Sequence, residues 1–592
     1  MPTAVMPAAI LSGRPSGSPD AAGLSGSMPG QESGAEEARA GVSVRCRVSR
    51  AASLLQIAAS LIFIPQAAAV SVAVGAIAAG SDAREAIWPA LLVAVLGVAR
   101  AVLDAVGSRM AFLSARAALS DLRTRAVIAL SAGSPLDTAR PPSGRAASVI
   151  AEQAEAVVPY LARFRPARLR ATVVPMVILA CVFAVSWVAA LVMLIAAPLI
   201  PLFMALIGWR AKEASERQLG EMGSLNGFLL DRLRGIATIR SLGAVDATAR
   251  RVRAEAESLR RRTMAVLRIA FLSSAVLELF AALGVAMVAV YVGFHLLGQI
   301  GFGAWGGKLG LGEGLFVLLL APAFFEPLRE LSAAWHDRAA GEAAIEALEN
   351  LSRDRTSFPG TQEDATTLPS AAPAVPGVRI EGLRFRHPGR SLLTFDGFDL
   401  AVAPGEHVAL LAPSGVGKST LLALIAGLAR PQGGRIMIGD APMDDANAAA
   451  LRQHMAWIGQ TPHIFAGTLA GNVSLGRPGI SSDDVADALG AMELAHIRDR
   501  APAAIGESGA GLSGGEALRL ALARVAATPE TGLILADEPT AHLDSATASG
   551  IAASLLTLAQ GRTLLVATHD PALAALMGRV VRLDASSLEA AA

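Results

Sequence analysis

Long apolar runs alternate with polar segments over roughly the first 350 residues. Six runs are centred on residues 52–79, 86–113, 157–184, 187–209, 264–297 and 311–335. Each is at least about 20 residues long, which is what a helix needs to cross the hydrocarbon core of a bilayer. Buried helices of a soluble protein would be neither this long nor this numerous. The pattern therefore predicts six helices embedded in a lipid bilayer.

The polar segments between the runs alternate in charge. The connections near 80–86, 184–187 and 298–311 are short and carry little positive charge, whereas the other two are long and rich in arginine, between Arg109 and Arg145 and between Lys212 and Arg262. Because positively charged loops stay on the cytoplasmic side, these loops and both termini are expected in the cytoplasm. The pattern predicts a multi-pass protein of the cytoplasmic (inner) membrane.

One stretch of the second arginine-rich loop, residues 225–242, has apolar side chains at helical spacing with charged residues between them. Such an amphipathic helix outside the membrane typically docks on another domain. A solvated arginine face is the alternative.

The pattern changes again outside the membrane runs. Residues 1–45 are rich in Gly, Ser, Pro and Ala and predict a disordered segment. A transmembrane domain with six helices is expected over 46–348, followed by a Pro- and Ala-rich linker at 349–377. From 378 to 592 short β-like runs alternate with helical segments, which predicts an α/β domain with a largely parallel sheet and its position in the cytoplasm.

Composition agrees with a membrane protein and gives no sign of a nucleic-acid partner. Hydrophobic residues make up 53% of the 592 residues, and 51 Lys and Arg balance 50 Asp and Glu. The two cysteines, Cys46 and Cys181, do not suggest a disulfide framework.

The candidate chemistry begins with a glycine loop between an apolar strand at 407–411 and a helix at 421–426. In that context backbone N–H groups and the helix N-terminus face a polyphosphate. Lys418 is expected to reach the β- and γ-phosphates, and the Ser419 hydroxyl to ligate Mg²⁺. The loop comprises Ala412, Pro413, Ser414, Gly415, Val416, Gly417, Lys418, Ser419 and Thr420.

Two carboxylates end a second apolar strand at 533–538. Asp537 suits the shell of Mg²⁺, and Glu538 lies where a general base would polarise the attacking water. Gln460 follows a strand-like run and is expected to contact the metal or the water, and His569 is expected to contact the γ-phosphate. Each residue alone has an ordinary structural explanation, but their order along the chain predicts one site.

A second phosphate-facing helix start is expected at Ser513, Gly514, Gly515 and Glu516, because these residues directly precede a helical segment.

This set of motifs resembles the ATP-binding cassette family over 378–592. The resemblance implies a Walker A loop at 412–420, a Q-loop at Gln460, a signature at 512–516, a Walker B strand at 533–538 and an H-loop at His569. It also implies a D-loop at 541–544 and an X-loop at 505–509. ATP and Mg²⁺ are the cofactors it implies, with Lys418, Glu538 and His569 as catalytic residues.

The resemblance further implies a partner. Six spans followed by one cassette is the half-transporter arrangement of exporters, in which each ATP lies between the Walker A loop of one chain and the signature of another. A second half-transporter chain is therefore expected.

Three positions depart from the family pattern. Ala412 replaces the usual first glycine, so its methyl group would cause strain if the position needs a positive φ. Glu516 stands where glutamine is usual, and His387 where an adenine-stacking tyrosine is usual. Each departure is expected to affect nucleotide affinity.

Segments of the membrane part, together with one segment of the cassette, resemble the CydD-type subunit of an exporter that supports cytochrome bd assembly. The resemblance implies a heterodimer with a CydC-type chain and a small-molecule cargo: cysteine, glutathione or haem. The segments are 197–206, 230–235, 260–264, 270–278, 316–322, 327–331 and 538–544.

Two other functions are considered: export of a lipid or hydrophobic compound, and a nucleotide-gated regulator. The first would predict few charged residues in the spans, but Arg100, Asp104, Arg268 and Glu278 lie in or near them. Glu538 and His569 argue against the second. Arginines within 163–170 and Arg268 are candidates for binding cargo carboxylates, or else are topology signals; Arg100 and Asp104 form either part of that site or a self-neutralising pair.

Overall fold

The computed structural model describes residues 50–80, 82–137, 140–200, 229, 232–233, 235–305, 307–353, 357–361, 375–477, 479–498, 505–506 and 511–583. The chain divides into two compact units. Residues 1–118 and 158–339 belong to the first unit, and residues 119–157 and 340–592 to the second. We call them the membrane unit and the cassette unit and describe each by itself.

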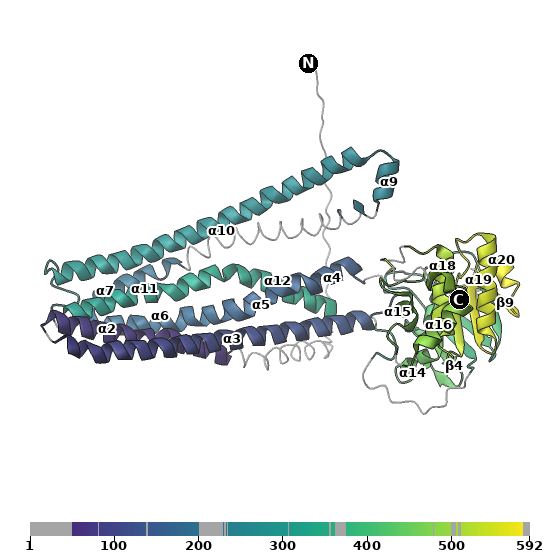
Figure 1. Cartoon of the computed structure of the whole chain (residues 1–592), viewed down its shortest axis with the longest axis horizontal. Helices are drawn as coiled ribbons and strands as arrows, with labels where there is room; N and C mark the ends of the chain where they lie inside the picture. Colours follow the sequence, from purple (N-terminus) through teal and green to yellow (C-terminus); the bar gives the residue numbers. More distant parts are fainter. Residues whose placement is uncertain are drawn as a thin grey trace, which may run out of the picture. The chain divides into compact units, whose positions relative to one another are not determined.

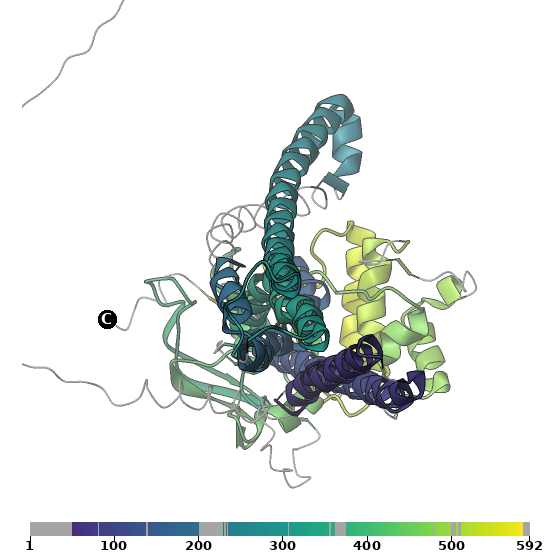
Figure 2. The same cartoon turned by 90° about the vertical axis from the view of Figure 1, so that its left-hand side faces the viewer.

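Helices build the membrane unit, and they lie side by side in Figure 1 and are viewed end on in Figure 2. Within the described residues, five helical segments are long and apolar enough to cross a membrane: Arg50–Ala78, Arg84–Ala132, Ser143–Val185, Glu278–Leu296 and Leu311–Ser352. These match five of the six predicted runs. The remaining run, 187–209, begins with the apolar helix α7 (Trp187–Ala196), and its last nine residues lie outside the described part.

The helices and short helical turns that contain these spans or connect them are α2 (Phe63–Ala78), η1 (Ala83–Ala86), α3 (Ile87–Ala132), α4 (Ser143–Ala151), η2 (Gln153–Ala156), α5 (Val157–Pro159), η3 (Tyr160–Phe164), α6 (Arg165–Val185), α9 (Ile236–Ser241), α10 (Val245–Leu296), α11 (Leu311–Ala333) and α12 (Trp335–Ser352).

Two of these helices are much longer than a bilayer is thick. Helix α3 has 46 residues and α10 has 52, which at 1.5 Å per residue gives about 70 and 80 Å. The hydrocarbon core is only about 30 Å thick. Much of the two arginine-rich loops predicted from the sequence therefore consists of helix that continues beyond the membrane.

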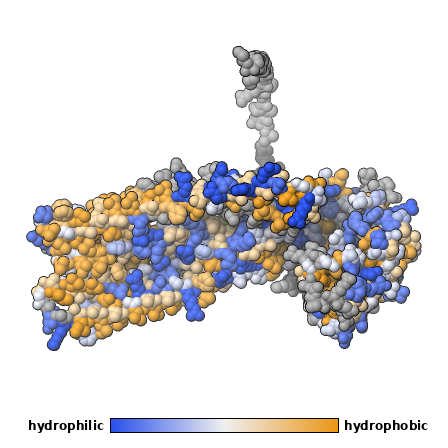
Figure 3. All heavy atoms as spheres, turned by 45° about the horizontal axis from the view of Figure 1, so that its top comes forward, coloured by the Kyte–Doolittle hydropathy of each residue, from blue (hydrophilic) through white to orange (hydrophobic). Residues whose placement is uncertain are grey.

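Helix α11 lies at the centre of the membrane unit. It packs against α2, α6 and α10, and its inward side chains Val317, Leu320, Phe324 and Phe325 are almost completely buried. On the face shown in Figure 3, hydrophobic side chains cover much of the outer surface of this unit. An apolar exterior around a packed apolar interior is what a bilayer requires, since lipid replaces water as the solvent.

The cassette unit contains two sheets. A five-stranded sheet has the order β6-β7-β8-β3-β9 with all neighbours parallel, and a four-stranded antiparallel sheet has the order β2-β1-β4-β5. The parallel sheet was predicted, whereas the antiparallel sheet was not. The strands are β1 (Val378–Phe385), β2 (Phe395–Val402), β3 (His407–Leu411), β4 (Gly433–Ile438), β5 (Ala441–Pro442), β6 (Met455–Ile458), β7 (Leu533–Asp537), β8 (Thr563–Thr568) and β9 (Arg579–Arg582).

Helices cover the sheets of the cassette unit and bury its apolar core. Every residue of β7 and β8 is buried, as expected for central strands of a parallel sheet. The helices are α13 (Lys418–Ile425), α14 (Ala448–Gln453), α15 (Leu469–Ser474), α16 (Ser482–Ala491), α17 (Ala495–Arg498), α18 (Gly514–Ala526), α19 (Ser545–Ala559) and α20 (Pro571–Ala574).

The first arginine-rich loop joins the cassette unit, which the sequence did not predict. The Ser134 hydroxyl donates a 2.6 Å hydrogen bond to the carbonyl of Leu428, and Gly133 forms a β-bridge with Ser357. Within the same unit, Arg430 donates to the Ser357 carbonyl and Arg452 to the Pro359 carbonyl. The described part of the predicted linker is therefore held against the cassette rather than free.

Some predictions from the sequence are not tested by the described residues. The N-terminal segment 1–45 lies outside the described residues, as does most of the X-loop. In the stretch 225–242, helix α9 has no buried residue, and most of the remainder is not described, so docking by this stretch stays a prediction. The domain boundaries at 348 and 377 also stay predictions, since the compact units exchange residues 119–157.

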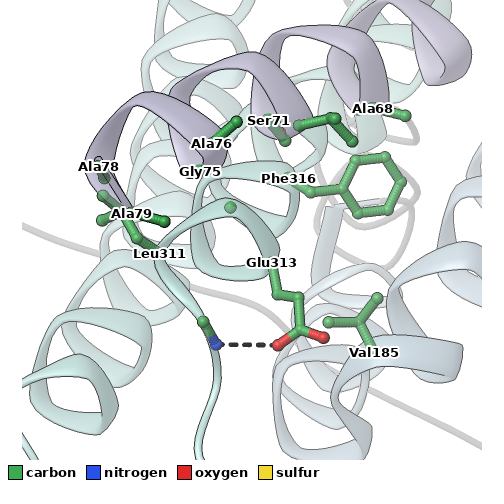
Figure 4. Close-up of a pocket in the computed structure, with 13 residues that line it drawn as sticks. Ala68, Ser71, Gly75, Ala76, Ala78, Ala79, Val185, Leu311, Glu313 and Phe316 are labelled. Atoms are coloured by element: carbon green, nitrogen blue, oxygen red, sulfur yellow. Dashed lines mark hydrogen bonds between the residues drawn. The ribbon is translucent and has the colours of Figure 1, made fainter. Parts of the chain in front are cut away.

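A cavity of about 650 Å³ lies where the end of α2 approaches the beginning of α11 (Figure 4). Its lining is apolar apart from Ser71 and Glu313, and the Glu313 carboxylate accepts the backbone N–H of Gly310 at 2.9 Å. The two helices are close here because Gly75 faces Gly312: a Cβ at Gly312 would lie 2.8 Å from the backbone oxygen of Ser71.

Gly312→Ala is expected to lower the stability of the protein by about 1 to 3 kcal/mol, because the new methyl group meets backbone atoms that cannot move independently. Thermal unfolding in lipid nanodiscs measures this change. Gly301→Ala is the matched control, since a Cβ there meets nothing within 4 Å. Equal unfolding temperatures for the two variants would contradict the close contact between α2 and α11.

Candidate functional site

The glycine loop runs from the carboxyl end of β3 into the N-terminus of α13. Gly415 and Gly417 have φ of 90° and 109°, values that residues with a Cβ rarely adopt. A Cβ on Gly417 would also lie 2.8 Å from Thr394 Cγ2. The loop therefore needs glycine at this position for two reasons, and it leads directly into the start of α13, where the sequence predicts an anion site.

Lys418 is buried, with only 4% of its surface exposed. Its Nζ donates hydrogen bonds to the carbonyls of Ala412 (2.7 Å) and Pro413 (3.0 Å) and lies 3.3 Å from Glu538 Oε1. A buried ammonium is costly unless it is paired and hydrogen-bonded, and here it is both. These contacts hold the cation under the glycine loop.

Asp537, the last residue of β7, is 7% exposed. Burial raises the pKa of its carboxyl, and the neighbouring Glu538 charge adds to that, while a hydrogen bond with Ser419 and the charge of Lys418 act in the opposite direction. Within the described residues its Oδ1 atom is buried without a hydrogen-bond partner. An orphaned carboxylate oxygen beside a serine hydroxyl is a fitting donor set for Mg²⁺, which prefers oxygen ligands.

Glu538 is held in a strained conformation. Its φ is +47°, which costs a non-glycine residue about 1 to 3 kcal/mol and is most often found at functional sites. The backbone N–H of Glu538 donates to the Ala567 carbonyl on β8 at 2.8 Å, and Glu538 Oε2 lies 2.8 Å from His569 Nδ1. The backbone thus aims the carboxylate at the space between Lys418 and His569.

His387 packs against the same helix start. Its Nε2 and the Thr420 hydroxyl are 3.1 Å apart and hydrogen-bonded, and burial, with the charge of Arg390, lowers the pKa of the imidazole. The ring is therefore neutral at neutral pH. Gln460 lies two residues after β6, the strand next to β7, and its side chain is exposed.

Ala412 does not show the strain considered from the sequence. Among the described residues the non-glycine positions with positive φ are Leu475, Glu493, Glu538 and His542, so Ala412 has an ordinary backbone. Its methyl group is buried in the apolar core of the cassette unit. Alanine replaces glycine here without a conformational penalty.

The signature residues form a helix cap. Ser513 is the N-cap of α18, its backbone N–H donates to Glu516 Oε2 at 2.7 Å, and the Glu516 N–H donates to the Ser513 hydroxyl at 3.3 Å. The hydrogen bond from the Ser513 N–H lowers the pKa of the Glu516 carboxyl. His496, whose Nε2 lies 3.3 Å from Glu516 Oε1, lowers this pKa to a smaller extent. Glutamate and glutamine both complete such a capping box, so this departure keeps the local structure.

The predicted residues therefore fall into two groups. The neighbouring strands β7, β8 and β3 bring Lys418, Ser419, Asp537, Glu538 and His569 together at one edge of the sheet. Ser513 to Glu516 begin a separate helix and bond to each other and to His496. The sequence did not predict that His496 contacts Glu516 or that Glu538 has a left-handed backbone. No sequence motif marks either feature.

A phosphate loop, paired carboxylates and a histidine at one sheet edge, in a chain with membrane-spanning helices, define an ATP-binding cassette transporter. The chain belongs to the ABC transporter family: the family model "ABC transporter" matches residues 395–541, and "ABC transporter transmembrane region" matches residues 51–306. It is a multi-pass membrane protein that couples ATP hydrolysis to transport.

Individual proteins of known sequence or structure show which members of the family the chain is similar to. The chain is 34% identical to the transport ATP-binding protein AarD of Providencia stuartii, over 88% of each chain. It is 36% identical to the glutathione/L-cysteine transport system ATP-binding/permease protein CydD of Escherichia coli, over 72% of each. In fold it resembles a bacterial Atm1-family ABC exporter with ATP bound, with a TM-score of 0.72 and 22% identity over 92% of this chain and 94% of that one.

Ala412→Gly is expected to leave ATP affinity within about twofold of the original and to lower stability by about 1 kcal/mol, because the substitution removes a buried methyl group and adds backbone freedom. Binding of a fluorescent ATP analogue and denaturant unfolding measure the two effects. A variant that binds ATP several-fold more tightly would show that the methyl group does strain the loop.

Proposed function

We propose that this chain exports a small thiol compound, cysteine or glutathione, or haem, across the cytoplasmic membrane, as one half of a heterodimeric transporter that supports cytochrome bd assembly. One observation carries the proposal: the likeness to CydD extends over both the membrane and the cassette parts of the chain. The cassette by itself would fit many transporters. We also propose that both termini and the cassette face the cytoplasm.

For ATP hydrolysis we propose that Lys418 neutralises the β- and γ-phosphates, which are stronger acceptors than the carbonyls it contacts here. Ser419, Asp537 and Gln460 are proposed to hold Mg²⁺, which would supply positive charge that offsets the charge of the phosphates. The signature residues Ser513 to Glu516 would contact the nucleotide of a second chain. The neutral His387 ring would contact the adenine.

Glu538 is the proposed general base. Its carboxylate lies between Lys418 and His569, beside the phosphate loop, where it can accept the proton of an attacking water. His569 would orient this carboxylate and contact the γ-phosphate. This arrangement disfavours a regulator that only binds ATP, which would need neither residue.

The partner proposal depends on the separate position of the signature. Ser513 and Glu516 bond to each other within their own helix cap, whereas Lys418 pairs with Glu538, which supports a signature supplied to this loop by another chain. CydC of Escherichia coli is also a relative of this chain, which supports a related but different partner.

A lipid exporter is the second candidate, because an ATP-dependent lipid A-core flippase of Chromobacterium violaceum is among the relatives. Charged side chains that line a cavity among the membrane helices favour a polar cargo instead.

Glu538→Gln is expected to lower ATP turnover by about 10²-fold or more while leaving ATP affinity nearly unchanged, because the amide cannot accept the proton but disturbs no phosphate contact. Turnover and nucleotide binding are measured on the complex in nanodiscs. Lys418→Ala is the contrasting variant, which should lose binding itself. Near-original turnover in the Glu538→Gln complex would remove this residue as the base.

ATPase activity is expected to appear only when the CydC-type partner is co-expressed, since each ATP needs residues of two chains. The ATPase rate per chain, compared between the purified single chain and the purified pair, tests this. Full activity in a preparation shown by mass photometry to be monomeric would contradict the proposal.

A further inference from the structure

A second cavity, of about 620 Å³, lies within the membrane unit between the first span, α3, α6 and α11. Its volume is in the range of ligand pockets, but its lining is unusual for membrane helices. Among the lining residues are two arginines and three carboxylates: Arg100, Arg170, Asp104, Glu326 and Glu330. We call these five residues the charged ring.

The residues of the charged ring lie at similar distances along their helices. Arg100 and Asp104 follow the first residue of α3 by 13 and 17 residues, Glu326 and Glu330 follow that of α11 by 15 and 19, and Arg170 precedes the end of α6 by 15. At 1.5 Å per residue these positions are about 20 to 28 Å from the same side. Charged side chains among membrane helices are costly and mark substrate pathways when they line a cavity.

Part of the ring is paired, but incompletely. Arg170 Nη2 lies 2.8 Å from Glu330 Oε2, yet the buried Arg170 Nε has no hydrogen-bond partner among the described residues. Glu326 lies 3.5 Å from Arg329, which is also 3.3 Å from Glu278. The Arg329 guanidinium therefore pairs with two carboxylates.

Arg100 differs from these pairs. Its guanidinium lies 5.2 Å from the centre of the Phe63 ring, a cation–π contact that fixes its plane but uses none of its N–H donors. Although Asp104 is one helical turn away, no ion pair joins the two within the described part of the chain. The self-neutralising pair considered from the sequence is therefore not formed, and Arg100 keeps its donors for a ligand.

The balance of charge shows what ligand would complete the ring. The cavity is lined by two arginines, Arg100 and Arg170, and by three carboxylates, Asp104, Glu326 and Glu330. If Arg100 binds a ligand carboxylate, the excess of negative over positive groups in the cavity increases. A cationic group on the same ligand would offset that excess. A molecule with one carboxylate and one ammonium group satisfies both ends.

We propose that this cavity is the cargo site and that it selects a dipolar amino acid or small peptide, whose carboxylate binds Arg100 and whose ammonium group binds Asp104 and Glu326. This inference rests on the proposed function and narrows it. Dicarboxylates without an amino group, such as haem, meet the three acidic side chains and are disfavoured.

The assignment also replaces part of the arginine hypothesis from the sequence. Arg163, Arg165, Arg168 and Arg268 do not line the cavity. Arg163 lies 3.6 Å from Asp337, and the Arg165 guanidinium lies 5.5 Å from the Tyr160 ring centre. Of the cluster 163–170, only Arg170 contributes to the charged ring.

Ligand binding to the full heterodimer in nanodiscs tests the site, with L-cysteine, its methyl ester, which lacks the carboxylate, and N-acetylcysteine, which lacks the ammonium group. Arg100→Gln is expected to weaken binding of L-cysteine about tenfold and binding of the ester by less than twofold. Asp104→Asn and Glu326→Gln are expected to weaken binding of L-cysteine and the ester but not of N-acetylcysteine.

Arg109→Gln is the matched control, because Arg109 is an exposed arginine on the same helix, does not line the cavity, and lies nine residues and therefore half a turn from the face of Arg100. It should bind all three ligands like the original. Unchanged binding of L-cysteine in all three ring variants would overturn the inference. Haem binding lost in Arg100→Gln but retained in Asp104→Asn, with no L-cysteine binding, would also overturn it.

Cargo-stimulated ATPase activity separates this inference from the proposed function. Stimulation by cysteine or glutathione that the ring variants do not alter would leave the proposed function in place and remove the cavity as its site. Binding of L-cysteine that depends on the ring, without stimulation by any thiol compound, would keep the site and contradict thiol export.

Discussion

The cost of taking charge out of water governs both units of this protein. In the cassette unit a buried ammonium, Lys418, lies beneath the phosphate loop and is stabilised by two carbonyls and the Glu538 carboxylate. Glu538 in turn is held by a strained backbone and by His569. Because each charge depends on the next, the loop, the end of β7 and the end of β8 must be aligned, and the order of the parallel sheet provides that alignment.

The membrane unit also contains charged side chains away from bulk water, but their charges are less completely paired. Its charged ring lies among apolar membrane helices, where its side chains face a cavity and Arg170 pairs with Glu330. In contrast to the cassette site, the pairing is incomplete: among the described residues Arg100 contacts an aromatic ring but forms no ion pair, and the buried Nε of Arg170 has no hydrogen bond. Residual charge of both signs favours a polar cargo over a lipid.

The sequence predicted what depends on local pattern. Run length predicted the membrane helices, the order strand, glycine loop, helix predicted a phosphate site, and an apolar strand ending in two carboxylates predicted its acidic residues. It missed features that depend on tertiary contact: the antiparallel sheet, the contact of Ser134 with Leu428, and the left-handed backbone of Glu538. It located Arg100 and Asp104, but only the packing of α3, α6 and α11 shows that they face the same cavity as Arg170, Glu326 and Glu330.

The central claim is that ATP turnover on this cassette drives a small thiol compound out of the cytoplasm. Uptake of radiolabelled cysteine and glutathione into inverted membrane vesicles that contain the chain and its partner tests it most directly. We predict uptake that requires ATP and is absent from vesicles carrying Glu538→Gln. Vesicles that hydrolyse ATP but accumulate neither compound, or that accumulate them equally with the Glu538→Gln chain, would contradict it.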